Sequence, residues 1–268
     1  MNIAFVGGGV MAEAMLQGIL REGVAHAQEV WVGEPVEGRR RALAERHGVA
    51  VTSDNLEAVQ HGDLVVLSVK PQNLPEVLGE LQGKLNGRQA LLSIVAGARM
   101  RALTEGLSHA HVIRVMPNTP AQVGAGMSLW LAAPSVSETF RTITRKVLGT
   151  LGDELEVAEE KLLDMATALS ASGPAYVFLF LEGLIAAGVY LGMTREMARR
   201  LALQTVLGSV RLAQETGKHP AELRDMVTSP GGTTAEALRV LEQRGFRSAV
   251  LDAVVAAYDK ARKLGEQR

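Results

Sequence analysis

The chain has 268 residues, of which 47% are hydrophobic and 21% are charged, so it can bury a substantial core and is not expected to be disordered. Its formal net charge of −1 excludes the broad basic surface that attracts nucleic acid or acidic lipid. Cysteine is absent, which excludes disulfides, cysteine-bound metals and thiolate catalysis. We expect a cytoplasmic protein, because this composition suits a reducing compartment and Met1–Val6 lacks the basic residues of a signal peptide.

The first half of the sequence alternates short apolar runs with helical stretches. Strands are predicted at Asn2–Val6, Glu29–Gly33, Leu64–Val69, Ala90–Ile94, His111–Val115 and Met127–Ala132. Helices are predicted at Val10–Glu22, Val36–His47, Leu74–Leu81 and Met100–Gly106. Strand alternating with helix is typical of a doubly wound parallel sheet, so we expect an α/β domain with a Rossmann-like sheet over residues 1–152.

The second half carries helical patterns only. They cover Glu159–Leu169, Pro174–Gly192, Arg195–Thr216, Pro220–Val227, Thr233–Gln243 and Phe246–Leu264. Ser172 and Thr194 are suited to cap the helices that follow them, and Gly192 and Gly217 are suited to end the helices that precede them. We therefore expect an all-α C-terminal domain over residues 153–268.

One apolar stretch of this domain, Tyr176–Met193, is long enough to be a candidate membrane span. It contains Glu182 and two interior glycines, Gly183 and Gly188, and no basic residue lies closely before it. A helix buried between domains or subunits is therefore the preferred interpretation. Because so apolar a surface is unfavourable in water, we expect the helical domain to form at least a homodimer, without membrane association.

A Gly-rich turn, Gly7-Gly8-Gly9-Val10-Met11-Ala12, follows the first predicted strand and opens the first predicted helix. It has the G-x-G-x-x-A form of the dinucleotide-binding fingerprint. Gly7 permits a tight turn, Gly9 lets a pyrophosphate approach the backbone, and Ala12 allows close packing of the helix on the strand. The helix N-terminus then presents free N–H groups to the phosphates. Three adjacent glycines can also form an ordinary turn, but the strand–turn–helix context favours a dinucleotide site.

The residues after the second predicted strand bear on the choice of nucleotide. Glu34 ends that strand, and an acidic residue there usually accepts hydrogen bonds from the adenosine ribose, which favours NAD. Arg39, Arg40 and Arg41 follow shortly and could bind a 2′-phosphate, although a solvated helix face explains them equally well. The sequence does not decide between NAD and NADP.

Three other loops carry polar groups. Residues 225–234 place hydroxyls on both sides of a Pro-Gly-Gly turn before a predicted helix, which could cradle a carboxylate, although this segment alone is more simply a capped helix start. Asn118 and Lys70 follow predicted strands, where parallel sheets bind ligands, although Lys70 by itself is more simply a solvated residue. The six histidines show no metal-ligand spacing with nearby acids, so we expect no metal site.

Several of these segments together resemble the pyrroline-5-carboxylate reductase family over nearly the whole length of the chain. The matching segments are residues 7–12, 69–71, 115–120, 169–176, 227–234 and 245–247. The turn at residues 7–12 is shared by many reductases. The stretch from Val227 to Thr234, followed by Gly245-Phe246-Arg247, is the most specific of them, and its Pro-Gly-Gly-x-Thr loop after a helical domain is close to diagnostic of the family.

The resemblance implies a Rossmann-like N-terminal domain, a C-terminal dimerisation domain, and NADPH- or NADH-dependent reduction of the pyrroline-5-carboxylate imine to L-proline. It implies a homodimer, or a higher homo-oligomer such as a ring of dimers. Thr234 is expected beside the imine nitrogen as the catalytic residue. The residues expected to bind substrate are Ser229, Gly231, Gly232, Thr233 and Thr234. The residues expected to bind cofactor are Gly7, Gly8, Gly9, Val10, Met11, Ala12, Glu34, Asn55, Val69, Lys70, Pro71, Ala96 and Asn118.

Three alternatives to this activity stay open. One is another imine reductase, and a second is a β-hydroxyacid dehydrogenase, whose members resemble each other in using an interdomain-helix lysine as acid and base. Pro174–Gly192 contains neither Lys nor His, which disfavours alcohol oxidation. The third alternative is a nucleotide-sensing protein without turnover, which the intact Thr234 loop disfavours. Glu34 departs from the Ser or Asn-Arg patterns of many NADP-preferring members of the family, so the nucleotide preference also stays open.

Overall fold

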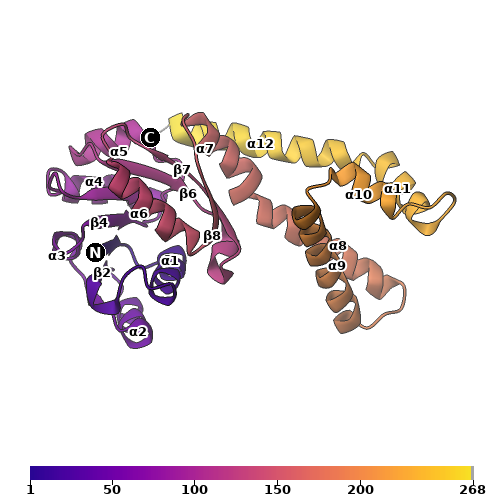
Figure 1. The fold of residues 1–268 in the computed structure, drawn as a ribbon, viewed down its shortest axis with the longest axis horizontal. Helices are drawn as coiled ribbons and strands as arrows, with labels where there is room; N and C mark the ends of the chain where they lie inside the picture. Colours follow the sequence, from indigo (N-terminus) through magenta and orange to yellow (C-terminus); the bar gives the residue numbers. More distant parts are fainter. Residues whose placement is uncertain (267–268) are drawn as a thin grey trace. The chain divides into compact units, whose positions relative to one another are not determined.

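The computed structural model describes residues 1–266 and divides into two compact units (Figure 1). The first unit comprises Met1–Ser172 together with the chain from Ala257 onward, and the second comprises Gly173–Ala256. The first is an α/β unit and the second is entirely helical, as the sequence predicts.

The first unit contains one eight-stranded sheet, with strand order β3-β2-β1-β4-β5-β6-β7-β8. The strands are β1 (Ile3–Val6), β2 (Val30–Gly33), β3 (Ala50–Thr52), β4 (Leu64–Leu67), β5 (Ala90–Ser93), β6 (Val112–Met116), β7 (Gly126–Ala132) and β8 (Gly152–Glu156). All neighbouring strands pair in parallel except β6 and β7, which pair antiparallel. The chain reverses direction along the sheet after β3, so the order has a topological switch at β1. The predicted Rossmann-like fold class is confirmed.

Helices cover both faces of this sheet (Figure 1). They are α1 (Val10–Arg21), α2 (Glu37–His47), α3 (Asn55–Gln60), α4 (Leu74–Leu81), α5 (Met100–Leu107) and α6 (Glu138–Gly149). Successive residues of a strand feed two separate apolar clusters: Phe5 belongs to the cluster with α1 and α6, and Val6 to the cluster with α4 and α5. Because both faces are buried, strands such as β1 are continuously apolar rather than alternating.

Two strands and two α-helices of the first unit were not predicted from the sequence. They are β3, α3, α6 and β8. The most consequential is β8, because the domain boundary expected at residue 152 falls at its start. Its sequence, Gly-Asp-Glu-Leu-Glu, is polar and half exposed, as suits a sheet edge, yet it pairs with β7 along its whole length. The α/β unit therefore extends past the expected boundary, to Ser172.

Two partly buried ion pairs hold the helix α7 (Lys161–Ala166) and the residue before it against β6 and the start of α5. Arg114 on β6 is buried and pairs with Glu160, and Arg99 pairs with Asp164 at 2.8 Å. Burial lowers the pKa of Arg114, and the carboxylate of Glu160 opposes that shift. Since removing one partner would leave the other charge buried and unpaired, these pairs hold α7 on the first unit.

The second unit is built from α8 (Gly173–Tyr190), α9 (Arg195–Thr216), α10 (Pro220–Met226), α11 (Thr233–Gln243) and α12 (Phe246–Glu266), the last of which continues into the first unit. Thr194 caps α9 by accepting a hydrogen bond from Met197 N at 3.2 Å, and Gly217 ends α9 in the left-handed conformation, so both predictions are confirmed. Gly188 lies where a Cβ would come within 2.8 Å of Ala198 Cβ, so its lack of a side chain lets α8 and α9 pack closely.

The expectation that Ser172 starts a new helix is wrong. Ser172 has helical dihedral angles (φ −83°, ψ −22°), and a π-helical turn at Thr167–Ala171 joins α7 to α8. The inserted turn lets the chain stay helical past a glycine and a proline that read as a helix start in the sequence. Lys161–Tyr190 is consequently one continuous helical stretch, and by length and composition alone it is apolar enough to cross a membrane.

Candidate functional site

A pocket of about 340 Å³ opens where β1, β2, β3 and β4 end. Ligands of open parallel sheets bind at these carboxyl ends, at the point where the strand order switches. The pocket is lined by Gly7, Gly9, Glu34, Pro35, Val36, Ser53, Asn55, Ser68, Val69, Lys70, Asn73, Glu76, Val77 and Glu80. It therefore contains six of the thirteen residues that the sequence assigns to the cofactor: Gly7, Gly9, Glu34, Asn55, Val69 and Lys70.

Gly7 makes the tight turn after β1. Its φ of +94° lies in the region that side chains rarely adopt, and a Cβ there would lie 2.5 Å from the carbonyl oxygen of Ser68. Its N–H donates to Gly33 O at 2.8 Å, which ties the end of β1 to the end of β2. The chain needs glycine at this position for its own fold, whether or not a ligand is bound.

Gly9 has a different environment. Its backbone is extended (φ −66°, ψ −178°), and a Cβ there would have no protein atom within 4 Å. Gly9 is exposed, lines the pocket and immediately precedes α1, whose N-terminus has no side-chain cap among the described residues. The open space beside it and the uncapped N–H groups fit a pyrophosphate, the anion that the fingerprint predicts.

Gly8 and Ala12 face the interior instead. A Cβ on Gly8 would lie 2.6 Å from Leu43 Cδ1, and Ala12 is buried in the apolar core between α1 and the sheet. Val10 and Met11 occupy the first turn of α1 and do not line the pocket. Of the predicted turn residues, Gly7 and Gly9 alone border the pocket, and the others shape the turn or the helix behind it.

Glu34 joins the turn to the end of β2. Its Oε2 accepts from Gly8 N at 2.9 Å and its Oε1 accepts from Val36 N at 2.9 Å, and the residue is 9% exposed. Both carboxylate oxygens are thus held by backbone N–H groups at the edge of the pocket. This arrangement fixes the side chain in place and leaves part of each oxygen's accepting capacity free.

Arg39 lies behind the turn. Its Nε donates to Gly8 O at 2.6 Å, and its Nη2 pairs with Glu13 at 2.7 Å. Glu13 also contacts His47 at 3.0 Å and Arg46 at 3.3 Å. The hydrogen bond from His47, with those from the two arginines, lowers the pKa of Glu13 to about 2. These ion pairs hold α2 against the start of α1, and the hydrogen bond from Arg39 to Gly8 O stabilises the Gly-rich turn.

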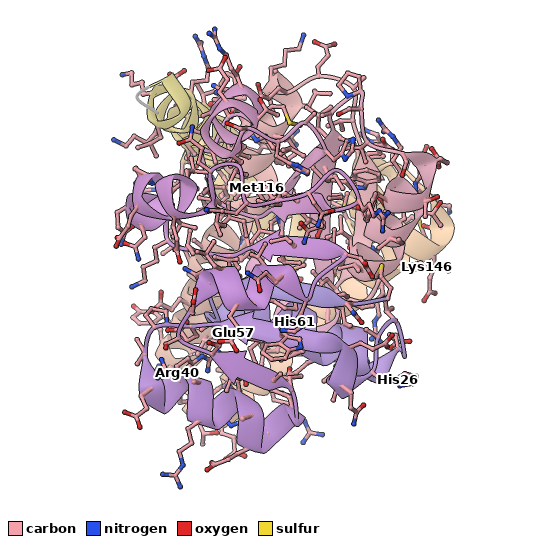
Figure 2. The ribbon with its side chains drawn as sticks, turned by 90° about the vertical axis from the view of Figure 1, so that its left-hand side faces the viewer. His26, Arg40, Glu57, His61, Met116 and Lys146 are labelled. Atoms are coloured by element: carbon pink, nitrogen blue, oxygen red, sulfur yellow. The ribbon has the colours of Figure 1, made fainter. Side chains whose placement is uncertain are left out.

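The other two arginines are also engaged. Arg40, labelled in Figure 2, donates through Nη1 to the carbonyl oxygens of Glu34 and Pro35, both at 2.7 Å. Arg41 is exposed and pairs with Glu45 one helical turn along α2. Neither residue is part of the pocket lining. The three arginines, which the sequence presents as one basic run, therefore have three separate positions.

Several predicted residues lie outside the pocket lining. Asn118 donates to Ser170 in the π-helical turn, at 3.2 Å to its hydroxyl, and accepts from Met127 N at 2.9 Å. Pro71 opens a short helical turn beside Lys70, and Ala96 follows β5. Asn118 thus links the β6–β7 connection to the π-helical turn, a structural contact that its place after a strand does not reveal in the sequence.

The second predicted site is the turn between α10 and α11 in the helical unit. Gly231 has a φ of +67°, which favours glycine, and a Cβ on Gly232 would lie 2.3 Å from Ser229 Oγ, so a side chain there would displace the serine hydroxyl. Gly232 precedes α11, and no side chain caps that helix among the described residues. Thr233 is exposed and Thr234 is half-buried in the first turn of α11. Uncapped N–H groups there fit a carboxylate.

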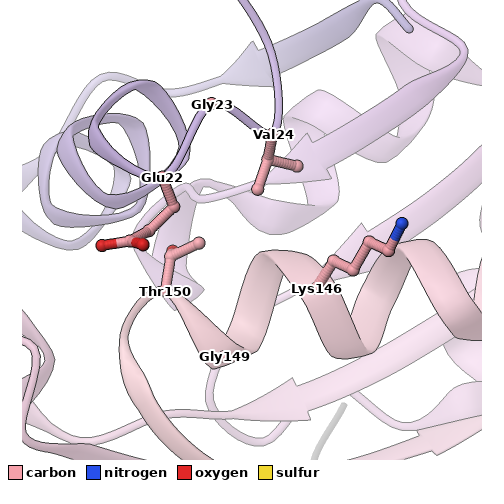
Figure 3. A pocket seen from close by; sticks show the side chains of 6 residues that line it. All are labelled: Glu22, Gly23, Val24, Lys146, Gly149 and Thr150. Atoms are coloured by element: carbon pink, nitrogen blue, oxygen red, sulfur yellow. The ribbon is translucent and has the colours of Figure 1, made fainter.

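Another hollow, shown in Figure 3, does not share these features. It is lined by Glu22, Gly23, Val24, Lys146, Gly149 and Thr150, at the C-terminal end of α1. It lies at the opposite end of α1 from the Gly-rich turn, so it has no helix N-terminus to offer an anion. Of these two hollows, only the pocket at the Gly-rich turn combines a helix N-terminus with the carboxyl ends of parallel strands.

Comparison with known proteins identifies the family that has this architecture. Residues 160–264 match the family model for pyrroline-5-carboxylate reductase dimerisation, and residues 2–97 match the model described as NADP oxidoreductase coenzyme F420-dependent. A pyrroline-5-carboxylate reductase of Synechocystis sp. is 44% identical over 266 residues, which cover 99% of this chain and 99% of the relative. The chain belongs to the pyrroline-5-carboxylate reductase family. The resemblance drawn from the sequence is confirmed.

Solved structures of the family have the same fold. A pyrroline-5-carboxylate reductase from Coxiella burnetii superposes with a TM-score of 0.91 at 35% identity, covering 98% of each chain. The Plasmodium falciparum pyrroline carboxylate reductase, crystallised with NADP bound, superposes with a TM-score of 0.90 at 33% identity, covering 99% of this chain and 98% of that one.

Sequence reasoning missed part of this family member's pocket. Ser53, Asn73, Glu76 and Glu80 all line it. Ser53 follows β3, a strand too short to recognise from its three residues, whereas Glu76 and Glu80 sit one turn apart on α4. The i, i+4 spacing of those two glutamates was the available signal, but it is also typical of any exposed helix face.

Proposed function

We propose that this chain is a pyrroline-5-carboxylate reductase, which reduces the cyclic imine of 1-pyrroline-5-carboxylate to L-proline with NADH or NADPH. The observation that carries the proposal is full-length similarity to this family combined with an open, glycine-lined pocket at the end of β1. When bound, the dinucleotide supplies the hydride. The tasks left to the protein are to bind both molecules, orient them and keep competing reactions out.

The cofactor would be held by the pocket of the first unit. Gly9 and the N-terminus of α1 would take the pyrophosphate, and Glu34 with Asn55 would border the adenosine ribose. Asn55 is oriented by a hydrogen bond from its Nδ2 to Glu80 at 2.8 Å, and it packs where a Cβ on Gly33 would clash. Lys70 is exposed at the rim, where its charge favours an anionic ligand.

The substrate would be held by the turn before α11. Its carboxylate would accept hydrogen bonds from the N–H groups of Gly232, Thr233 and Thr234, supported by the positive end of the helix dipole. The Gly232 N–H already donates to Ser229 O at 3.1 Å, so the N–H groups inside the first turn of α11 are the principal donors. Ser229 supplies a hydroxyl next to them.

Thr234 is the proposed catalytic residue. A neutral hydroxyl can donate to or accept from the substrate nitrogen as it changes from imine to amine. A cyclic imine accepts hydride more readily when it is protonated, and solvent can supply that proton. The site therefore does not require a strongly acidic side chain, which suits a turn built from backbone N–H groups and hydroxyls.

We also propose a cytoplasmic homodimer or a ring of dimers, without membrane or nucleic-acid partners. α8 has no buried residue within the chain, and an apolar groove of about 540 Å³ runs along it. The groove is lined by Tyr176, Leu179, Phe180, Gly183, Leu184, Leu241, Phe246, Ala249, Val250 and Ala253. A second copy of the chain would cover this surface, and the match of residues 160–264 to a dimerisation domain supports that occupant.

The proposed activity is tested by incubating the purified chain with pyrroline-5-carboxylate and each reduced nucleotide. We expect loss of nucleotide absorbance in step with the appearance of proline. A β-hydroxyacid dehydrogenase would instead oxidise small hydroxyacids with the oxidised nucleotides and ignore the imine. A nucleotide-sensing protein would bind nucleotide without consuming it, and either result would contradict the proposal.

A further inference from the structure

The charged side chains that line the pocket are three carboxylates, Glu34, Glu76 and Glu80, and one ammonium group, Lys70. We infer that Glu34 makes this protein prefer NADH over NADPH, an inference that rests on the proposed function. The Glu34 carboxylate stands at the carboxyl end of β2, where this fold places the adenosine ribose. NADH presents a 2′-hydroxyl there and NADPH a 2′-phosphate, so the two differ by up to two negative charges at this point.

The hydrogen-bonding capacity of Glu34 matches a hydroxyl and not a phosphate. Each carboxylate oxygen already accepts one backbone N–H, from Gly8 and from Val36, and each retains a second lone pair. A ribose hydroxyl can donate to that lone pair. A 2′-phosphate oxygen has no proton to donate near neutral pH, and it would meet the carboxylate as a like charge.

Glu34 is also unable to move aside at low cost. It is 9% exposed, and its withdrawal would leave the Gly8 and Val36 N–H groups without their acceptor. The Gly8 N–H belongs to the Gly-rich turn itself. The discriminating side chain is therefore built into the turn that binds the phosphates, and accommodating NADPH would disturb that turn.

The two nearest arginines already donate to protein oxygen atoms, Arg40 through its Nη1 alone. Arg39 points at Gly8 O and Glu13 behind the turn, and Arg40 is bonded to the carbonyl oxygens of Glu34 and Pro35. The remaining charged side chains of the pocket lining are Glu76, Glu80 and Lys70. With Glu34 this gives three carboxylates against one ammonium group, which disfavours the additional phosphate.

The test is the equilibrium binding of NADH and NADPH to the full chain, measured by calorimetry at matched ionic strength. We expect NADH to bind about ten- to a hundredfold more tightly, the range for one close like-charge contact near a protein surface. The preference should shrink as salt is raised, because screening weakens the repulsion. Equal binding, or tighter NADPH binding, would overturn the inference.

Two variants and a control separate the effects of Glu34 and Arg40 on the ratio of the NADH and NADPH affinities. Glu34→Gln removes the charge and should narrow the preference about tenfold, even if both nucleotides bind more weakly. Arg40→Ala should leave the ratio of the two affinities unchanged. If Arg40 instead binds the 2′-phosphate, the same variant would weaken NADPH selectively, and the wild-type preference for NADH would grow with salt. Arg41→Ala is the matched control, since Arg41 is exposed and pairs only with Glu45 among the described residues.

These measurements distinguish the inference from the proposed function. Failure of both nucleotides to bind would contradict the reductase assignment itself. Binding of both with NADPH preferred would leave the reductase assignment standing and remove Glu34 as the determinant of preference. Circular dichroism on each variant checks that the fold is retained, so that a weaker affinity is not misread as unfolding.

Discussion

Two glycines of the turn, Gly7 and Gly9, are alike in the sequence and different in the structure. Gly7 has a positive φ and a carbonyl oxygen where its Cβ would be, whereas Gly9 has an ordinary extended backbone beside open space. A side chain at Gly7 therefore strains the fold, and a side chain at Gly9 meets only what binds in the pocket. The distinction gives a test of which glycine serves the ligand.

We expect Gly9→Val to abolish measurable nucleotide binding while the melting temperature stays close to wild type. The branched side chain fits the protein and fills the space proposed for the pyrophosphate. Gly7→Ala is the contrasting variant, and it should lower the melting temperature because both backbone strain and a clash with Ser68 result. Unchanged nucleotide titration in a folded Gly9→Val protein would mean that the turn is only structural.

Thr234 tests the substrate turn at the same scale. Thr234→Ala removes one hydroxyl without removing a helix cap, because the residue before α11 is Gly232 and its cap involves no side chain. We expect kcat/KM to fall roughly ten- to a thousandfold, the range for one hydrogen bond to a transition state. Nucleotide affinity should stay near wild type. Full activity in a stably folded variant would remove Thr234 from the site.

At the scale of elements, the ion pairs of Glu13 with Arg39, Arg46 and His47 make the stability of the packing between α1 and α2 depend on pH. The pKa of Glu13 is lowered from 4.5 to about 2 by its hydrogen bonds to His47, Arg39 and Arg46. The ionised form is therefore favoured in the folded state, and its stabilisation is present above about pH 4.5 and lost as the pH falls toward 2.

Glu13→Gln should thus lower the free energy of unfolding at pH 7 by on the order of 1 kcal/mol, a value typical of a partly exposed ion pair. The difference should shrink as the pH falls from about 4.5 and vanish near pH 2, where the wild-type carboxylate is protonated in the folded state as well. Urea titrations at both pH values measure this. If the free energies of unfolding of wild type and variant differ equally at pH 7 and at pH 2, the Glu13 side chain stabilises the fold through packing and not through its charge.

The elements themselves were predictable where apolar residues dominate. β1, β4 and β5 lie between two covered faces, so their continuous apolar runs mark them clearly. β8 and β3 were not predictable, because the first is polar and the second has three residues, and both owe their conformation to pairing with a neighbour. The same limit applies to Ser172, where a π-helical turn keeps the helix continuous.

The residues of the candidate site likewise fall into those that the sequence predicts and those that only the fold reveals. The fingerprint located Gly7 and Gly9 because glycine has a local conformational meaning. Glu76 and Glu80 were missed because only the fold carries α4 to the pocket. The hydrogen bonds of Arg39 to Glu13 and Gly8 could not be predicted either, because these partners lie far from it in the sequence.

At the scale of the whole molecule, the exposed apolar groove along α8 predicts a dimer in solution. Leu179 is 69% exposed within the single chain and lines that groove. We expect light scattering to give a mass of at least two chains for the wild type, and Leu179→Glu to shift it toward one chain, because a buried unpaired charge is costly at an interface.

Val123→Glu is the matched control for that experiment. Val123 is 79% exposed and lies in the first unit, outside the groove, so its substitution should leave the mass unchanged. A wild-type mass of one chain at micromolar concentration would contradict the dimer and leave the surface of α8 without an explanation.

The central claim is hydride transfer to the imine carbon of pyrroline-5-carboxylate, and isotope transfer tests it most directly. The full chain is supplied with the substrate and a reduced nucleotide carrying deuterium at both C4 positions of the nicotinamide, and the product is analysed by mass spectrometry and NMR. We expect L-proline with one deuterium at its δ carbon, in an amount equal to the nucleotide consumed. Nucleotide oxidised without labelled proline, or no turnover from a folded protein that binds nucleotide, would contradict the account.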